Sequence, residues 1–202
     1  MNPLSVGVLG GSFNPIHLGH MELAKEAHIQ FGLGNILLMP TSLTWYKDTS
    51  SLAGPKHRLA MARLGAKEMG EEYMRASSID IDRGGITYTC DTVNELRDVY
   101  DDIYFIIGSD SLMYIDEWKN AGDFLKKCII LYGKRDGDDV EAISEKKKFL
   151  KQEYGADIRE LKIKKIPISS SDIRKRIKSG KSITGLVPKS VEEYIMENNL
   201  YR

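Results

Sequence analysis

Only two of the 202 residues are cysteines, Cys90 and Cys128, and the chain has no Cys-x-x-Cys pair and no Cys/His cluster. This spacing argues against a disulfide framework or a structural zinc site and favours two reduced thiols. Lys plus Arg and Asp plus Glu both number 29, and a formal net charge of zero argues against a general nucleic-acid coat protein. The chain also lacks a basic-then-apolar signal segment and any run near the ~20 apolar residues of a membrane span. We therefore expect a cytoplasmic protein with neither nucleic-acid nor membrane partners.

Two common nucleotide-binding patterns are missing as well, the GxGxxG fingerprint and the Walker P-loop. What the chain has instead is a glycine pair, Gly10-Gly11, directly after the apolar run 4–9, and two histidines, His17 and His20, three residues apart. The apolar run predicts a buried strand, and the helical spacing of apolar residues predicts a helix over 18–31.

The segment from Val8 to His20 has the features of a binding site for a chain of phosphates. Glycine amides, a helix N-terminus and two imidazoles can all donate hydrogen bonds to phosphate oxygens. A tight strand-to-helix turn would explain the glycines equally well, and a metal site could use two histidines. Helical metal ligands are more often spaced i,i+4 with a third ligand nearby, so phosphate binding without a protein-held metal is favoured.

Strands and helices alternate along the chain. This alternation predicts an α/β, Rossmann-like, doubly wound and mostly parallel sheet with helices on both faces. We expect one domain over 1–202, with a small C-terminal helical part at about 169–202. The predicted strands are 4–9, 35–40, one within 73–81, 103–107, 128–132, 158–163 and 166–168. The predicted helices are 18–31, 55–70, 92–100, 111–118, 121–127, 140–154, 169–179 and 191–198.

Helix starts are indicated by capping residues. Thr92-x-x-Glu95 and Ser190-x-x-Glu193 match the capping box, in which the first hydroxyl caps a helix. Ser169-Ser170-Ser171 predicts the cap of a basic helix that ends before Gly180.

Two further polar clusters have both a plain and a functional interpretation. Asp110, after Gly108, could cap a helix, or accept hydrogen bonds from a ribose or base, or help to hold a magnesium-bound phosphate. The serines at 169–171 with Arg174 could be a capped helix or an anion site. Tyr114 and Trp118 are spaced i,i+4 and would share one helix face, either for core packing or to stack on a flat ligand ring.

Five segments together indicate a known family. They are GGSFNPIHLGH (10–20), DRGGITYTCDT (82–92), GSDSLMYIDEW (108–118), ISSSDIRKRI (168–177) and LVPKSVEEYIMENNLY (186–201). With them the sequence resembles the bacterial nicotinate-nucleotide adenylyltransferases of the HxGH nucleotidyltransferase superfamily, over almost the whole chain.

The resemblance implies a reaction. AMP would pass from ATP to the 5′-phosphate of nicotinate mononucleotide, giving deamido-NAD and pyrophosphate in NAD biosynthesis. ATP is then a co-substrate that requires Mg²⁺, and no metal-ligating residues are assigned in the protein. The sequence leaves open whether the enzyme is a homo-oligomer.

The resemblance also implies roles for particular residues. His17, His20 and Arg174 would be catalytic. ATP would contact Gly10, Gly11, Ser12, Phe13, His17, His20, Gly108, Asp110, Ile168, Ser169, Ser170 and Arg174. Nicotinate mononucleotide would contact Ser12, Phe13, Lys47, Thr89, Tyr114 and Trp118.

The chain departs from the family pattern at two places. Family members commonly read Pro-Pro-His-Lys where this chain has Thr44-Trp45-Tyr46-Lys47, and threonine is usual where Ser171 stands. Two alternative functions remain open. One is adenylyl transfer to nicotinamide mononucleotide, and the other is a non-catalytic nucleotide-binding protein of the same fold. The second would be expected to lose a motif histidine or Arg174, and this chain keeps both.

Overall fold

The computed structural model describes residues 4–43, 52–69, 72–134, 137–163 and 167–202. The chain divides into two compact units. The first is Met1–Leu9, Leu23–Ile36 and Tyr88–Lys165, and the second is Gly10–Glu22, Leu37–Thr87 and Ile166–Arg202. The single domain expected over 1–202 stays a prediction.

Six strands form the sheet in the order β3-β2-β1-β4-β5-β6. Their bounds are Ser5–Gly11 (β1), Ile36–Pro40 (β2), Met74–Ala76 (β3), Asp102–Gly108 (β4), Ile129–Gly133 (β5) and Asp157–Leu161 (β6). This is the order of the doubly wound dinucleotide-binding fold, in which the direction of winding reverses between the first and fourth strands. The predicted fold class is therefore confirmed.

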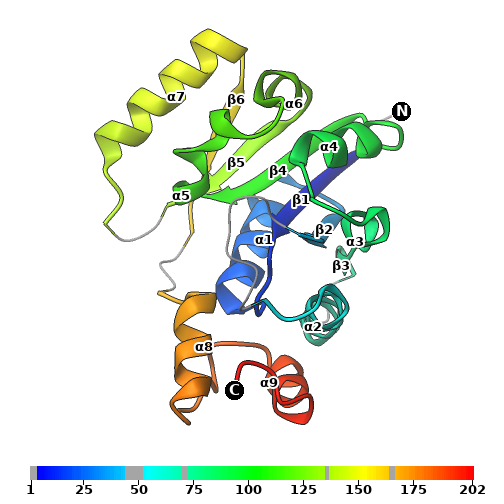
Figure 1. Ribbon diagram of the computed structural model, residues 1–202. Helices are drawn as coiled ribbons and strands as arrows, with labels where there is room; N and C mark the ends of the chain where they lie inside the picture. The colour runs from blue at the N-terminus through cyan, green and yellow to red at the C-terminus, as the bar shows by residue number, and fades with distance from the viewer. Residues whose placement is uncertain (1–3, 44–51, 70–71, 135–136, 164–166) are drawn as a thin grey trace. The chain divides into compact units, whose positions relative to one another are not determined.

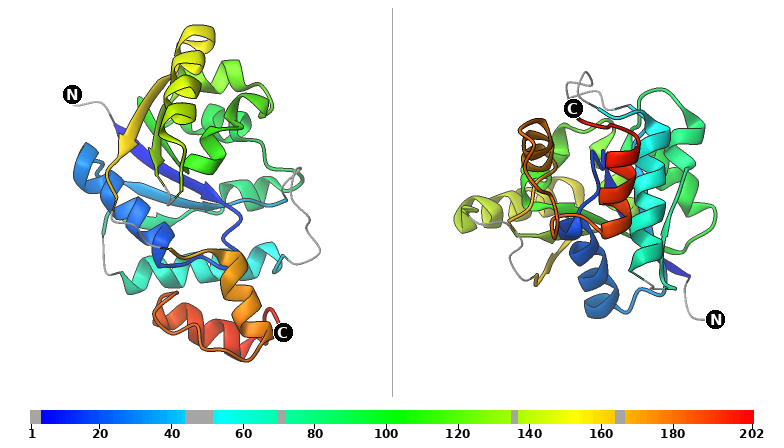
Figure 2. Two further views of the ribbon diagram at one scale, coloured as in Figure 1. Left: turned by 90° about the vertical axis from the view of Figure 1, so that its left-hand side faces the viewer. Right: turned by 90° about the horizontal axis from the view of Figure 1, so that it is seen from below.

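In the first unit β1, β4, β5 and β6 run parallel, with Val8 opposite Phe105 and Ile130 opposite Ile158. Helices cover both faces of these strands (Figures 1 and 2). On one face, the Leu23 side chain packs so closely on Gly133 that a Cβ there would lie 2.5 Å from Leu23 Cδ2. The helices of this unit are α4 (Thr89–Arg97), α5 (Ser109–Leu112), α6 (Ala121–Lys127) and α7 (Val140–Tyr154), with a 3₁₀ turn η1 (Ile115–Glu117). Helix α1 (Leu18–Phe31) begins in the second unit and belongs to the first from Leu23 onward.

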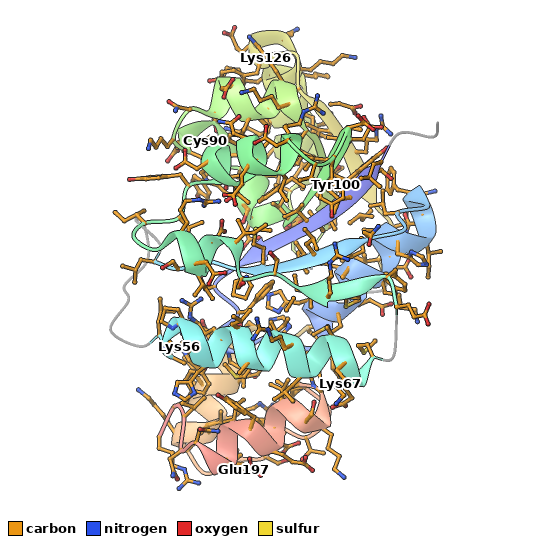
Figure 3. All side chains as sticks on the ribbon, turned by 90° about the vertical axis from the view of Figure 1, so that its right-hand side faces the viewer. Lys56, Lys67, Cys90, Tyr100, Lys126 and Glu197 are labelled. Atoms are coloured by element: carbon orange, nitrogen blue, oxygen red, sulfur yellow. The ribbon has the colours of Figure 1, made fainter. Side chains whose placement is uncertain are left out.

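The second unit contains α2 (Pro55–Glu68), α3 (Ile79–Arg83), α8 (Ser170–Lys178) and α9 (Lys189–Glu197). Figure 3 shows α2 and α9 side by side, with Lys56 and Lys67 at the two ends of α2 and Glu197 at the end of α9. The two helices are joined by the Glu68 carboxylate, which accepts hydrogen bonds from the backbone N–H groups of Lys189 (2.8 Å) and Ser190 (2.6 Å). A residue of α2 thus caps the N-terminus of α9.

Several predicted boundaries are wrong. Thr92 lies inside α4, which begins at Thr89, and its hydroxyl donates to the carbonyl of Tyr88. Ser190 lies inside α9, whose N-cap is Pro188. Residues 79–83 form α3 instead of a strand end and loop, and residues 167 and 168 form no strand. Within the part of the chain that the structure describes, no helix is long and apolar enough to cross a membrane.

Candidate active site

The two motif histidines stand at the start of α1 in the second unit. Their rings stack with centroids 3.7 Å apart and planes 29° apart. The backbone N–H of His17 donates to Nδ1 of His20 at 3.2 Å. Because Nδ1 is used as an acceptor, the neutral His20 ring carries its proton on Nε2, where it can be donated to a ligand. Phe13 supports this ring from the side, edge-on at 5.0 Å.

Gly19, between the histidines, is required by this stacking. A Cβ at Gly19 would lie 3.1 Å from Nδ1 and 3.2 Å from Cε1 of His17, closer than most side-chain carbons approach a neighbour. Any larger residue would therefore displace the His17 imidazole. The glycine of the HxGH motif has a steric role that spacing alone did not reveal.

Helix α8 is anchored on the loop that precedes the histidines. Arg174 Nη1 donates to the carbonyl of Asn14 at 2.9 Å, and Ser170 Oγ donates to the carbonyl of Pro15 at 2.9 Å. Ser169 caps α8 by accepting from the N–H of Asp172 at 3.1 Å, as predicted. The structure thus brings Ser169, Ser170 and Arg174 to the same loop as His17.

Arg58 of α2 holds the same loop from inside the second unit. Its side chain is 1% exposed and donates to the carbonyls of Ser12 (2.8 Å), Thr41 (2.6 Å), Ser42 (2.6 Å) and Ala53 (2.9 Å). Burial lowers the pKa of the Arg58 guanidinium from its ordinary value, yet arginine stays charged in proteins. One cation therefore fixes the segments that follow β1 and β2.

Two hydroxyls just after these strands can accept a further partner. Ser12 Oγ and Thr41 Oγ1 are buried, and neither has a hydrogen-bond partner among the described residues. Buried polar groups are usually satisfied, so a group left over at a strand end is a candidate ligand contact.

In the first unit, Gly108 ends β4 and pairs with Gly133 of β5. The helix after it begins one residue earlier than Asp110, at Ser109, and Gly108 is its N-cap. Asp110 lies exposed in the first turn, while Ser109 is 1% exposed with an Oγ that has no partner among the described residues. The capping interpretation of Asp110 is wrong, and Ser109 is a candidate that sequence reasoning did not single out.

Tyr114 and Trp118 do not share a helix face. Backbone angles leave the helical region on both sides of η1, with Tyr114 at φ −120°, ψ 10° and Trp118 at φ −71°, ψ 148°. Trp118 packs edge-on against Phe105 and stacks on Phe124, whereas Tyr114 is 61% exposed. The prediction of a continuous helix was wrong here, because the chain leaves the helical conformation and the half-buried indole packs on Phe105 and Phe124.

Thr89 is the first residue of α4, and a lysine ties this helix start to the segment after Trp118. Lys119 Nζ lies 3.9 Å from the ring centroid of Tyr88, the N-cap residue of α4. The Tyr88 carbonyl accepts from the N–H groups of Asp91 (3.1 Å) and Thr92 (3.3 Å), but among the described residues no side chain caps the amides of Thr89 and Cys90. The structure thus brings Tyr88, the neighbour of Thr89, together with Lys119, the neighbour of Trp118, at the start of α4.

Comparison with known proteins gives the family. The model of the cytidylyltransferase-like family matches residues 8–176. A protein of Carboxydothermus hydrogenoformans named "Probable nicotinate-nucleotide adenylyltransferase" is 39% identical over 199 residues, covering 98% of both chains. A protein of Thermoanaerobacter sp. with the same name is 35% identical over 202 residues, covering 98% of this chain and 95% of its own. The chain belongs to the nicotinate-nucleotide adenylyltransferase family.

The fold agrees with solved structures. The nicotinic acid mononucleotide adenylyltransferase of Plasmodium falciparum, solved in complex with APC, superposes with a TM-score of 0.76 at 22% identity, covering 98% of this chain and 96% of that chain. At that identity the likeness shows the fold alone.

The remaining candidate residues lie at the end of β1, in the loop after it and just before α8. Gly10 and Gly11 end β1, Phe13 is 2% exposed with a left-handed φ of 47°, and Ile168 lies just before the cap of α8. Lys47 lies outside the described residues, as do the other residues of the altered segment 44–47. Sequence reasoning also missed Arg58, Gly19 and Lys119 as parts of the site.

The described residues include no group of three or more His, Cys, Asp or Glu side chains that could hold a metal ion. This donor set fits a magnesium ion carried mainly by substrate phosphates and water, because Mg²⁺ commonly needs only one or two protein carboxylates. Asp110 is the candidate carboxylate that the sequence analysis named.

Proposed function

We propose that this protein transfers the AMP group of ATP to the 5′-phosphate of nicotinate mononucleotide, giving deamido-NAD and pyrophosphate in NAD biosynthesis. One observation carries the proposal: the stacked pair of His17 and His20, on a loop that Arg174 and Ser170 anchor from α8. The family to which the chain belongs supports the choice of substrates.

The reaction needs two polyanions held in line. A 5′-phosphate oxygen of the mononucleotide bonds to the α-phosphorus of ATP as the bond to the pyrophosphate oxygen breaks. Negative charge then grows on the α-phosphoryl oxygens and on the leaving group. No covalent enzyme intermediate is required, so positioning and electrostatic stabilisation account for the catalysis.

In this proposal the residues of the second unit bind phosphates. His20 donates through Nε2, His17 stacks behind it, and Gly10, Gly11 and the Ser12 hydroxyl contact both nucleotides. Arg174, with Ser169 and Ser170, holds the β- and γ-phosphates. Magnesium bound with ATP would neutralise phosphate charge. Asp110 is the candidate protein carboxylate that would help to hold it.

The residues of the first unit would bind the nicotinate ring and choose acid over amide. The amides of Thr89 and Cys90, which no side chain caps among the described residues, supply hydrogen-bond donors, and the nearby Lys119 ammonium supplies positive charge. The carboxylate of nicotinate accepts hydrogen bonds from these donors through both of its oxygens. The NH₂ group of nicotinamide is itself a donor and would face them without forming a hydrogen bond. Tyr114 and Trp118 border the ring, and Lys47 reaches the mononucleotide phosphate. A cytoplasmic location, a single domain and the oligomeric state remain predictions.

The test is steady-state turnover with MgATP and either mononucleotide, following pyrophosphate and the dinucleotide product. We expect higher kcat/KM for the nicotinate than for the nicotinamide substrate. Equal or better use of the amide would favour the nicotinamide alternative. No turnover with either substrate, together with tight ATP binding, would favour a non-catalytic nucleotide-binding protein.

A further inference from the structure

The second unit contains a cavity of about 560 Å³ beside α8. Its walls are the chain at 52–53, one face of α8 and the segment 200–202. The α8 face consists of Ser171, Arg174, Lys175 and Lys178, which are spaced i, i+3, i+4 and i+7 and therefore lie on one side of the helix. Only Arg174 of these was assigned to the candidate active site.

The cavity wall is cationic. Four of the nine lining residues are basic, namely Arg174, Lys175, Lys178 and Arg202, and no acidic residue is among the described residues that line it. The acid of α8, Asp172, pairs with Arg176 at 3.0 Å on another part of the helix. Like charges one helical turn apart destabilise a helix slightly, so this cluster has an energetic cost that an anion would remove. In a chain of zero formal net charge, such a cluster is a local feature.

The cavity is connected to the nucleotide loop through Arg174. The Nη1 group of Arg174 is bonded to the carbonyl of Asn14, and the guanidinium keeps other N–H donors that this bond does not use. Tyr201 lines the same cavity, and its phenol is close to both Arg174 and Arg58. Burial raises the pKa of Tyr201, while the two guanidiniums act in the opposite direction.

The lysines extend the positive charge away from the loop. Lys178 stands four residues beyond Arg174, which corresponds to roughly 6 Å along the helix axis. An anion with several linked charged groups could therefore contact Arg174 at one end and Lys178 at the other, whereas a single small anion could not use the whole cluster.

We propose that this cavity is a binding site for a condensed phosphate, occupied by the inorganic pyrophosphate that the reaction releases. The inference rests on the proposed function for the identity of its ligand. Arg174 holds the β- and γ-phosphates during transfer, and Lys175 and Lys178 accept the pyrophosphate once the bond to the α-phosphorus has broken. The two lysines then set the affinity for pyrophosphate without touching the reacting atoms.

The direct test is calorimetric titration of the protein with inorganic pyrophosphate, without nucleotide or metal. The variant is Lys175→Gln/Lys178→Gln. The matched control, Lys148→Gln/Lys151→Gln, removes two exposed lysines of the same spacing from α7. We expect the variant to bind pyrophosphate about 10-fold more weakly, because each lysine contributes one partly screened charge contact. The control should bind as the wild type does.

Kinetics provide a second measurement. The variant should show weaker product inhibition by pyrophosphate, by the same factor, with the initial-rate kcat and KM for ATP within about 2-fold of wild type. Equal pyrophosphate affinity in variant and wild type would overturn the proposal. So would orthophosphate binding as tightly as pyrophosphate, since the site would then be a general anion site.

The two proposals fail separately. Lysine-dependent pyrophosphate binding in a protein with no turnover would refute the proposed reaction and leave the condensed-phosphate site standing. Normal turnover with lysine-independent pyrophosphate binding would refute the site and leave the reaction standing.

Discussion

The guanidinium of Arg58 donates a 2.8 Å hydrogen bond to the backbone carbonyl of Ser12. The same group binds three further carbonyls, at Thr41, Ser42 and Ala53. Four carbonyl oxygens around one cation resemble the coordination that an oxygen-loving metal ion would have, but here the cation is part of the chain. The loop that carries the candidate phosphate contacts is therefore shaped by a residue that is almost fully buried behind it.

Replacing Arg58 tests this arrangement. Arg58→Met leaves several buried carbonyls without a donor and should lower the free energy of unfolding by about 3 kcal/mol or more. Arg58→Lys keeps the charge and up to three donors, and should recover part of both the stability and kcat/KM. Urea unfolding monitored by circular dichroism, together with steady-state kinetics, measures the two effects. A Met variant as stable as the wild type would show that the four bonds contribute little.

Gly19→Ala should change stability and activity in opposite directions. Alanine in place of a helical glycine stabilises by up to about 1 kcal/mol, but its Cβ would press on the His17 ring. Displacement of a catalytic group by a fraction of an ångström should reduce kcat by roughly 10-fold. Gly34→Ala is the control, because a Cβ there meets nothing within 4 Å. Unchanged turnover in the Gly19 variant would mean that the position of His17 is not critical.

The stacked histidines should behave as one unit. His17→Ala or His20→Ala should each reduce turnover by about 10²-fold, by analogy with the deletion of one oxyanion donor. Because the His17 N–H holds the His20 ring and the rings stack, the double variant should lose little more than either single variant. Multiplicative losses, measured as kcat/KM for ATP, would instead indicate independent roles.

Glu68→Ala tests the cap that α2 provides for α9. Loss of the bonds to Lys189 and Ser190 should cost on the order of 1 kcal/mol of unfolding free energy, as for other helix caps. Burial alone would raise the pKa of the Glu68 carboxyl, but the hydrogen bonds from Ser190 and Lys189 outweigh burial and lower it.

The sign of that shift predicts a pH dependence. A lowered pKa in the folded protein means that Glu68 stabilises above the ordinary pKa of a glutamate and loses this effect as pH falls through the lowered value. Denaturation of wild type and Glu68→Ala should therefore differ at neutral pH and converge in acid. Glu145→Ala, which removes an exposed acid from α7, should show no such convergence.

Lys119→Met should weaken the preference for acid over amide. Lys119 adds positive charge beside the start of α4, an effect worth roughly 2- to 5-fold in favour of a carboxylate. We expect the ratio of kcat/KM for nicotinate over nicotinamide mononucleotide to fall by that factor. Lys126→Met, on the exposed surface of α6, is the control. An unchanged ratio in the Lys119 variant would assign the choice to backbone amides alone.

Patterns that depend on local sequence predicted the fold well. The helices over 18–31, 121–127 and 140–154 were predicted with the observed bounds, because apolar spacing and terminal signals both lie within the element. The capping-box prediction at Ser190 failed because a distant residue provides the cap: the Glu68 carboxylate accepts from the Ser190 N–H. The prediction of a helix over 111–118 failed because packing of the Trp118 ring on Phe105 and Phe124 overrides helical spacing.

The sequence was sufficient to name candidate polar residues for the site, whose ligand contacts stay predictions, but not to find the residues that support them. Polar residues after strands could be found from the order of the chain. The sequence alone could not distinguish Arg58 from an exposed basic residue, because its burial depends on four carbonyls from three other segments. One signal was available: Arg58 lies four residues before Ala62 and seven before Gly65, on the buried face of α2.

The bond between Arg58 and Ser12 also sets the polarity of the loop surface. The C=O and N–H groups of a trans peptide point in nearly opposite directions. With the Ser12 carbonyl turned inward to a buried guanidinium, the N–H of Phe13 is turned outward. At this one peptide the hydrogen-bond donor faces away from Arg58, and the buried cation reinforces the peptide dipole. An anion that approached this peptide from its N–H side would meet the positive end of a dipole before any side chain made contact, whereas a free cation would be repelled.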